Sequence, residues 1–425
     1  MHCDLNNFYA SCECLLKPAI RGEAVVVCGR VEDRHGIVLA KNYKAKEFGI
    51  KTGDVLWEAK LKCPKLVSVE ARHSVYIKFS RVVRQIYSEY SDRIEPFGID
   101  EAWIDLTGIV HSFSEAEARA NEIRERVKSE VGLTISVGVS FCKVFAKLGS
   151  DMKKPDAVTV LTPENFKEKV WPLPVSDLLY VGRATTRKFA DLNILTIGDL
   201  ANFDSQIIKK KFGKVGVMLL EYARGEERGE VRKYDERAEI KSVGNSITYY
   251  KDIIAREDIF ALFLLLAESV VARMKSYGFK KARNLIVSVM DNNLVLFHRM
   301  IKMTPVTDIA TDIAKHSMNV FEKHFAYRSK VRGLGISVSE FTDEEQTYLF
   351  SDVKENEKKE KLQEAVEKLR GRFGRKIIQR ATIMRDPRMK EINIIEEHQI
   401  NPNIFDGLDK QKQDRDKLIT KLCNN

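Results

Sequence analysis

Apolar and polar residues in the first part of the chain follow two kinds of spacing. Compact β-branched runs at 23–28, 36–40 and 134–139 predict strands, and we expect the first two to pair. Apolar residues that recur every three or four positions over 75–90 and 116–131 predict helices. Strands that interleave in this way with hairpins and helices predict an α+β fold with a mostly antiparallel sheet.

Local signals place the ends of some of these elements. We expect Ser114 to cap the helix at 116–131, which Gly132 ends. A basic helix at 41–49 is expected to end at its glycine. A short strand that turns into a helix begins the chain, and its few residues are short for a buried strand.

A break at 171–174, which contains two prolines, ends this first pattern. Residues 176–225 then read as helical and basic, with tight turns at Gly182 and Gly198. A charged stretch at 224–237 predicts an exposed linker. The middle of the chain is therefore expected to form a small helical domain.

Strands return at residue 241, with helical runs at 255–277 and 308–325 between them. That arrangement predicts a second α+β module. Residues 351–369 predict a charged helix, and the chain after Met389 is polar, with no firm structural signal.

The composition narrows the class of protein. The chain has 425 residues, which is too long for one ordinary core, and 71 Lys and Arg against 61 Asp and Glu give a net charge of +10. That excess suits a polyanionic partner without proving one. Seven scattered cysteines with no C-x-x-C pair argue against a disulfide framework or zinc ribbon. With no leader and no long apolar run, we expect a cytoplasmic protein with no membrane span.

Acidic residues inside apolar strands are the main candidates for chemistry. Asp4 lies near the chain start, and Asp100 and Glu101 lie in the apolar run 98–106. Carboxylates disfavour burial unless they are paired or bound to a cation, and oxygen ligands favour Mg²⁺ or Mn²⁺ over zinc. Neighbours on a strand face opposite sides, so Asp100 and Glu101 can share a site only near a turn or bulge. The alternative is that Asp100 and Glu101 are edge-strand acids paired to lysines.

Several other residues could either bind a ligand or have a purely structural role. Tyr43 and Lys46 share a helix face and could hold a polyphosphate, although a solvated basic face is the commoner meaning. Phe8 could contact a ligand or simply pack in the core. The turn at Gly182 could present backbone N–H groups to a DNA phosphate, although lone glycines in turns are usually just turns. A basic cluster could bind a nucleic-acid backbone or be solvated, and it comprises Lys280, Lys281 and Arg283.

Several motifs jointly resemble those of the Y-family DNA polymerases, the translesion enzymes of the bacterial polymerase IV and V type, over roughly residues 1–350. Residues 4–13 resemble the first catalytic motif, and 98–101 resemble the second, with Gly98 in place of the usual Ser. Residues 42–46 are similar to the triphosphate-binding segment, with Lys46 where Arg is common. The last palm motif and the opening of the little finger are matched at 140–155 and 241–246.

The resemblance implies a role for each of these residues. Metal ligands would be Asp4, Asp100, Glu101 and the Leu5 carbonyl, holding two Mg²⁺ ions, with Mn²⁺ as an alternative. Tyr9 would be the steric gate against ribonucleotides. Contacts to the nucleotide would come from Phe8, Tyr9, Tyr43, Lys46 and Lys154, and contacts to DNA from Gly182, Lys280, Lys281 and Arg283.

The resemblance also implies a right-hand arrangement with a ferredoxin-like palm, small fingers, a helical thumb and a separate α+β little finger. Gln346, Leu349 and Phe350 are similar to the sliding-clamp (beta subunit) peptide of bacterial polymerases, with Thr347 in place of the usual Leu. The expected segments are palm 1–15 and 71–165, fingers 16–70, thumb 166–230 with helix-hairpin-helix-like turns, linker 231–240, little finger 241–341, clamp peptide 342–350 and charged tail 351–425.

The implied function is template-directed, low-fidelity DNA synthesis past damaged bases, in DNA repair and the SOS response. The partners would be primer–template DNA, deoxynucleoside triphosphates and the clamp, and we expect a monomer. Two alternatives stay open. The chain could be a nucleotide cyclase on a related palm, or a DNA-binding accessory protein with an altered active site.

Overall fold

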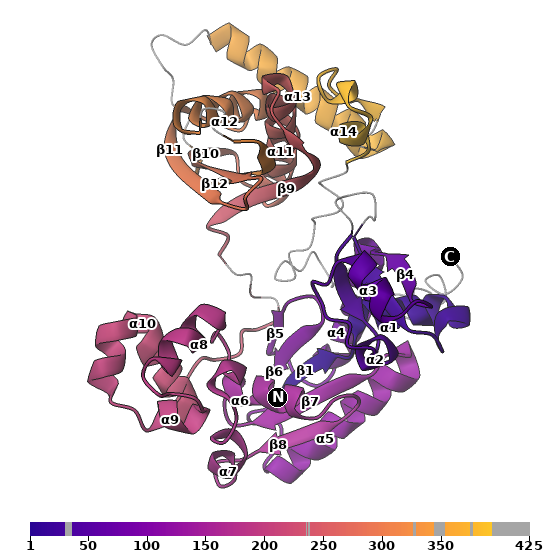
Figure 1. The fold of residues 1–425 in the computed structure, drawn as a ribbon, viewed down its shortest axis with the longest axis vertical. Helices are drawn as coiled ribbons and strands as arrows, with labels where there is room; N and C mark the ends of the chain where they lie inside the picture. The colour runs from indigo at the N-terminus through magenta and orange to yellow at the C-terminus, as the bar shows by residue number, and fades with distance from the viewer. Residues whose placement is uncertain are drawn as a thin grey trace. The chain divides into compact units, whose positions relative to one another are not determined.

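The computed structural model describes residues 1–29, 36–234, 236, 239–325, 329–343, 353–374 and 377–392. The described residues up to 236 form one compact unit, and those from 239 form a second. Figure 1 labels the helices and strands of each unit. No helix in these residues is long and apolar enough to cross a membrane.

A five-stranded sheet is the centre of the first unit, with the strand order β5-β6-β1-β7-β8. All neighbours are antiparallel except β7 and β8, which are parallel. The strands are β1 (His2–Leu5), β5 (Ile94–Phe97), β6 (Glu101–Ile104), β7 (Ile135–Ser140) and β8 (Val158–Leu161). β1, which carries Asp4, therefore lies in the middle of the sheet with a hydrogen-bonded strand on each side.

Helices cover both faces of this sheet. One face packs against α4 and α5 through a core that includes Cys3, Phe79 and Ile123, and the opposite face packs against α6. The helices are α1 (Phe8–Leu16), α4 (His73–Ser88), α5 (Phe113–Arg126) with a π-helical turn at Val127–Val131, and α6 (Lys143–Met152). Alternating side chains of β1 consequently point to different helices.

The expected cap of α5 was wrong by two residues. Ser112 is the N-cap, and its hydroxyl accepts a hydrogen bond from the backbone N–H of Glu115. The chain takes up helical geometry already at Phe113, so Ser114 falls inside the first turn. The aromatic residue between the two serines gave no local signal that would have distinguished them.

A small three-stranded sheet and two short helices form a separate core within the first unit. The expected pairing of the runs at 23–28 and 36–40 is confirmed, because β2 and β3 are antiparallel neighbours. The elements are β2 (Val25–Cys28), β3 (Val38–Lys41), β4 (Val67–Glu70), α2 (Tyr43–Glu47) and α3 (Leu56–Lys62). Asn42 caps α2 by accepting from the N–H of Ala45, so Tyr43 stands in its first turn.

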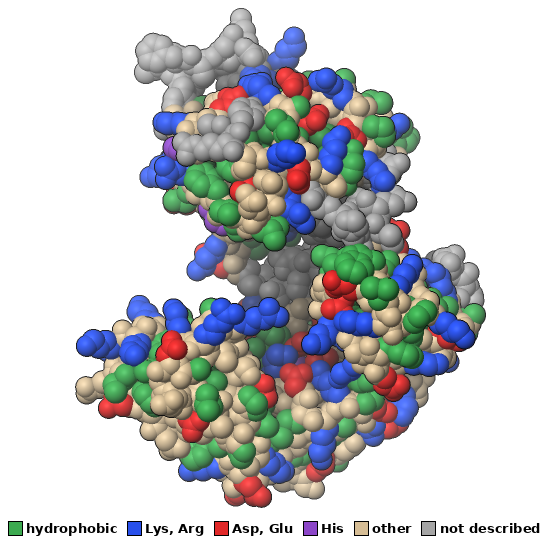
Figure 2. All heavy atoms as spheres, viewed as in Figure 1, with side chains coloured by type: hydrophobic (Ala, Val, Ile, Leu, Met, Phe, Trp, Pro, Cys, Tyr) green, Lys and Arg blue, Asp and Glu red, His purple; other side chains and the backbone are tan. Residues whose placement is uncertain are grey.

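A group of helices follows the sheet, and it shares a hydrophobic core with the outer face of α6, through Phe145 and Leu148. They are α7 (Phe166–Val170), α8 (Arg183–Ala190), α9 (Ile197–Ala201) and α10 (Ser205–Arg224). A row of Lys and Arg side chains follows one edge of this helical group (Figure 2).

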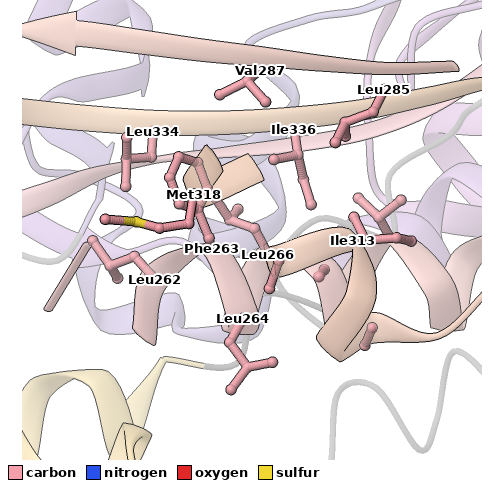
Figure 3. Close-up of a cluster of buried hydrophobic side chains, with 14 of the residues drawn as sticks. Leu262, Phe263, Leu264, Leu266, Leu285, Val287, Ile313, Met318, Leu334 and Ile336 are labelled. Carbon is pink, nitrogen blue, oxygen red and sulfur yellow. The ribbon is translucent and has the colours of Figure 1, made fainter. Parts of the chain in front are cut away.

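The second unit is a four-stranded antiparallel sheet, with the order β11-β10-β12-β9, packed on two helices. Strand residues such as Leu285 and Ile336 face helix residues such as Phe263 and Met318 in one buried cluster (Figure 3). The elements are β9 (Ser242–Ile253), β10 (Lys281–Asp291), β11 (Leu296–Thr307), β12 (Val331–Thr342), α11 (Arg256–Ser276) and α12 (Ala310–His324).

Part of the segment expected to be a charged tail is folded onto this second unit. It contains α13 (Val353–Phe373) and α14 (Pro387–Glu391). Ile383 and Met389 are buried in the same core as the sheet. Their isolated positions in a polar stretch explain why the sequence pattern did not predict this packing.

Gly138 of β7 sets how closely α6 approaches the sheet. A Cβ atom at this position would lie 1.9 Å from the carbonyl oxygen of Ala146 and 2.5 Å from the backbone nitrogen of Ser150. Backbone atoms of a packed helix cannot yield as a flexible side chain can. The glycine is therefore required for α6 to lie where it does.

We predict that Gly138→Ala lowers the free energy of unfolding by about 3 kcal/mol or more, because α6 must move away from the sheet. Urea unfolding followed by circular dichroism measures this loss. Gly22→Ala is the matched control, because a Cβ there would meet nothing within 4 Å. Equal stability of the two variants would contradict the proposed close packing.

Candidate active site

Three carboxylates approach one another where β1 ends and β6 begins, on two inner strands of the central sheet. Asp4 of β1 is paired in register with Glu101 of β6. The next residue, Leu5, donates its backbone N–H to the carbonyl oxygen of Asp100 at 3.1 Å. Asp100 belongs to the turn between β5 and β6, and Glu101 begins β6. The turn therefore removes the difficulty that neighbouring strand residues face opposite sides.

Helix α4 holds this turn in place. The Arg84 guanidinium donates to the carbonyl oxygen of Gly98 at 2.7 Å, and the Ser80 hydroxyl donates to that of Ile99. Gly98 has a φ of +82°, in the left-handed region that favours glycine. Glycine at the position where a serine is usual thus suits the shape of this turn.

Two lysines and a histidine contact the acids. Lys154 donates to Asp4 Oδ2 at 2.8 Å, and Lys147 of α6 donates to Glu101. Nε2 of His2 lies 3.1 Å from Glu101 Oε2. The two lysines offset the charge of carboxylates that are largely removed from water.

The pKa shifts agree with this geometry. Burial raises the pKa of Asp4 to about 6, although Lys154 opposes the shift. Burial also raises the pKa of Asp100 to about 6, and the nearby charges of Asp4 and Glu101 add to the effect. Burial works in the same direction on Glu101, but the contacts with His2 and Lys147 outweigh it and lower its pKa. The three acids are thus close enough to influence one another's ionisation.

The donor set fits a hard divalent cation by its chemistry, because carboxylate and carbonyl oxygens are the ligands that Mg²⁺ prefers. The side chains are not already gathered around a metal position. Within the described part of the chain, no three His, Cys, Asp or Glu residues form a group that could hold an ion. Asp4 and Glu101 each contact a lysine instead.

Tyr9 is held beside this site by an aromatic stack. Its ring lies 4.3 Å from the ring of Tyr76, with an interplanar angle of 14°. The Tyr76 hydroxyl donates to the buried carboxylate of Glu13 at 2.8 Å, and Arg72 donates two further hydrogen bonds to Glu13. Burial raises the pKa of Tyr9 to about 12, and the charge of Asp100 contributes. Tyr9 is therefore a fixed, neutral ring close to Asp100.

Of the residues expected to contact the triphosphate or nucleotide, some lie near the acids and Phe8 lies in the core. Burial raises the pKa of Tyr43, the charge of Lys154 opposes the shift and that of Asp4 adds to it, so the phenol is within electrostatic range of both. Lys46 is exposed, with its ammonium group 5.9 Å from the centre of the Tyr43 ring. Phe8 is buried in the core, at 3% exposure, which favours the packing interpretation for this residue.

The expected DNA-binding residues belong to different units. Gly182 is the exposed N-cap of α8 in the first unit. In the second unit, Lys280 and Lys281 lie at the start of β10, and Lys281 is 3.7 Å from Glu360 of α13. Arg283 lies in the same strand. Gln346, Leu349 and Phe350 lie outside the described residues.

Sequence reasoning missed the groups that contact the acids from α6 and β1. Neither Lys147 nor His2 was singled out. One signal was available for His2, since it is two residues from Asp4 on a strand and so faces the same side. No pattern in the sequence pairs Lys147 with Glu101, because that contact depends on how α6 packs on the sheet.

Comparison with known proteins follows the same division of the chain. Residues 3–151 match the impB/mucB/samB family, 240–349 match the C-terminal domain of that family, and 176–227 match the DNA polymerase-iota thumb domain. DNA polymerase IV of Acetivibrio thermocellus is 47% identical over 92% of this chain and 99% of its own length. DNA polymerase IV 1 of Bacillus subtilis is 35% identical over 92% and 94%.

Solved structures agree on the fold. A chimera of the Y-family DNA polymerases Dbh and Dpo4 superimposes with a TM-score of 0.72, at 22% identity, over 80% of this chain and 98% of that chain. An insertion ternary complex of Dbh DNA polymerase gives a TM-score of 0.56 with the same coverage. The architecture is thus that of a right-hand polymerase.

The chain belongs to the Y-family of translesion DNA polymerases. The expected family and the expected α+β right-hand fold are confirmed. Relatives that match nearly the whole chain are called DNA polymerase IV, so neither the cyclase nor the accessory-protein alternative is favoured.

Proposed function

We propose that this enzyme adds deoxynucleotides to a primer 3′-hydroxyl at the site formed by Asp4, Asp100 and Glu101. The observation that carries the assignment is the close approach of these three carboxylates where β1 ends and β6 begins. Asp4 lies opposite Glu101, and the Leu5 backbone N–H donates a hydrogen bond to the Asp100 carbonyl oxygen. Primer–template DNA and deoxynucleoside triphosphates are then the substrates. Action as a monomer in the cytoplasm belongs to the same proposal.

Asp4, Asp100, Glu101 and the Leu5 carbonyl would hold two Mg²⁺ ions, or Mn²⁺. When bound, such ions lower the pKa of an attacking hydroxyl and neutralise the charge of a transferred phosphoryl group. The protein's own contribution is a set of oxygen ligands carried by a central strand, the start of its neighbour and the adjoining turn. Binding a cation there would replace the present contacts with Lys147 and Lys154.

Lys154, Tyr43 and Lys46 would hold the triphosphate. Lys154 lies 2.8 Å from Asp4, so a short movement of a flexible side chain would bring its charge to a phosphate beside the metal site. Tyr43 would contribute its hydroxyl from the first turn of α2. Lys46 is exposed at the same helix and would act as a point charge.

We predict that Asp100→Asn reduces primer extension in Mg²⁺ on the order of 10³-fold, because a metal-binding carboxylate becomes a neutral amide. The measurement is gel-resolved extension of a primed template. Asp105→Asn is the matched control, because the Asp105 carboxylate accepts from the backbone N–H of Thr107, outside the proposed site. Full extension by Asp100→Asn would reject the assigned site, and cyclic-nucleotide formation without extension would favour the cyclase.

We predict that Tyr9→Ala weakens discrimination against ribonucleotides by about 10²-fold, because the ring fixed by Tyr76 would otherwise collide with a 2′-hydroxyl. The ratio of kcat/KM for matched deoxy- and ribonucleotides measures this change. Tyr9→Phe keeps the ring and should keep the discrimination. An unchanged ratio in Tyr9→Ala would show that another group excludes the 2′-hydroxyl.

We also propose that the 346–350 segment binds a bacterial sliding clamp through Gln346, Leu349 and Phe350. Phe350→Ala should weaken binding to a purified clamp at least about tenfold, measured by calorimetry, because the aromatic side chain acts as an anchor. Thr347→Leu restores the more usual residue of this pattern and should tighten binding. A full-length chain with Phe350→Ala that binds the clamp normally would place the contact elsewhere.

A further inference from the structure

His2 is a polar residue enclosed by protein beside the active site. It is fully buried in β1, two residues before Asp4 on the same face of the strand. Its Nδ1 lies 2.9 Å from the hydroxyl oxygen of Ser150, and its Nε2 lies 3.1 Å from Glu101 Oε2. The ring edge also packs against Trp103, with the ring centres 5.2 Å apart.

Ser150 fixes the orientation of this ring. Ser150 is fully buried in α6, and its hydroxyl oxygen lies 2.7 Å from the carbonyl oxygen of Lys147 and 2.9 Å from Nδ1 of His2. A carboxylate can only accept, so the ring nitrogen that faces Glu101 must carry the hydrogen, and a neutral imidazole has a single N–H. Nε2 is therefore the donor toward Glu101, and Nδ1 accepts from the Ser150 hydroxyl.

Two groups that depend on α6 therefore contact the Glu101 carboxylate. Lys147 contacts Oε2 directly, and Ser150 acts on the same oxygen through His2. A glutamate side chain has several rotatable bonds and would otherwise sample many rotamers. Contacts of this kind, which orient a ligand without touching the metal, tune metal sites in other proteins.

We propose that His2, anchored by Ser150, is a positioning residue that holds the Glu101 carboxylate ready for a divalent cation. This inference rests on the proposed role of Glu101 in metal binding. His2 touches neither substrate nor metal in this scheme. Its loss should affect the cation more than the nucleotide.

The test compares three variants of His2, which differ in the hydrogen-bonding groups they keep. His2→Gln places an amide nitrogen close to the position of Nε2, and His2→Asn places one close to Nδ1 instead. His2→Leu removes both. Cys3→Ala is the matched control, because Cys3 is also buried in β1 but packs in the core on the opposite face of the sheet.

Each full-length variant is assayed in four ways. Mn²⁺ binding is measured by the loss of the free-ion electron paramagnetic resonance signal, with a dideoxy-terminated primer–template and the matching nucleotide present. The Mg²⁺ concentration for half-maximal primer extension, the KM for the nucleotide and the melting temperature complete the set.

We expect His2→Leu and His2→Asn to weaken Mn²⁺ binding by about 10- to 100-fold and to raise the Mg²⁺ requirement in parallel. The KM for the nucleotide should stay within about twofold. His2→Gln should restore most of the Mn²⁺ affinity, because it keeps a donor facing Glu101. Cys3→Ala should lower the melting temperature without changing Mn²⁺ binding.

Two results would overturn the proposal. Wild-type Mn²⁺ affinity in His2→Leu would show that Glu101 needs no positioning by this residue. An equal loss in all three His2 variants that follows the melting temperature would show a purely structural role. Glu101→Gln separates this failure from failure of the proposed site, because unchanged Mn²⁺ binding and extension in that variant would reject Glu101 itself.

Discussion

The burial of carboxylates in the middle of a β-sheet is the constraint on which this active site depends. Asp4 lies on β1, which has a hydrogen-bonded neighbour on each side, so its position is set by two registers at once. A buried carboxylate is costly unless opposite charges lie nearby. The surrounding structure therefore has to supply positively charged side chains. Lys147 of α6 and Lys154, which follows α6, do so.

Helix α6 links the chemistry of the site to the packing of the domain. One face of this helix lies against the sheet, where Gly138 permits a close approach, and carries Lys147 and Ser150 toward the acids. The other face packs into the core that it shares with the helices of 166–224. A single short helix thus fixes the distances among charged groups because both of its faces are packed.

The second unit shows a related use of paired charges. Glu268 of α11 accepts from Arg370 of α13 at 3.1 Å and from Arg380 at 2.6 Å. Together with the burial of Ile383 and Met389, these bonds attach the 353–392 segment to the sheet and helices before it. This segment is rich in charged residues. It packs on the second unit because a few of its apolar side chains are buried in the core formed by the sheet and helices that precede it.

The family, the α+β class and the identity of the unusual acids could all be predicted from the residues in order. Those features are local, since a carboxylate inside an apolar strand and a β-branched run can be recognised without knowing their neighbours in space. Which side chains contact the acids could be seen only in the tertiary structure. Lys147 lies 46 residues from Glu101 and Ser150 lies 148 residues from His2, and these pairs form only when strand register and helix packing bring them together. The packing of the segment after residue 352 on the second unit was missed for the same physical reason, because Ile383 and Met389 are buried by residues that are distant in the chain.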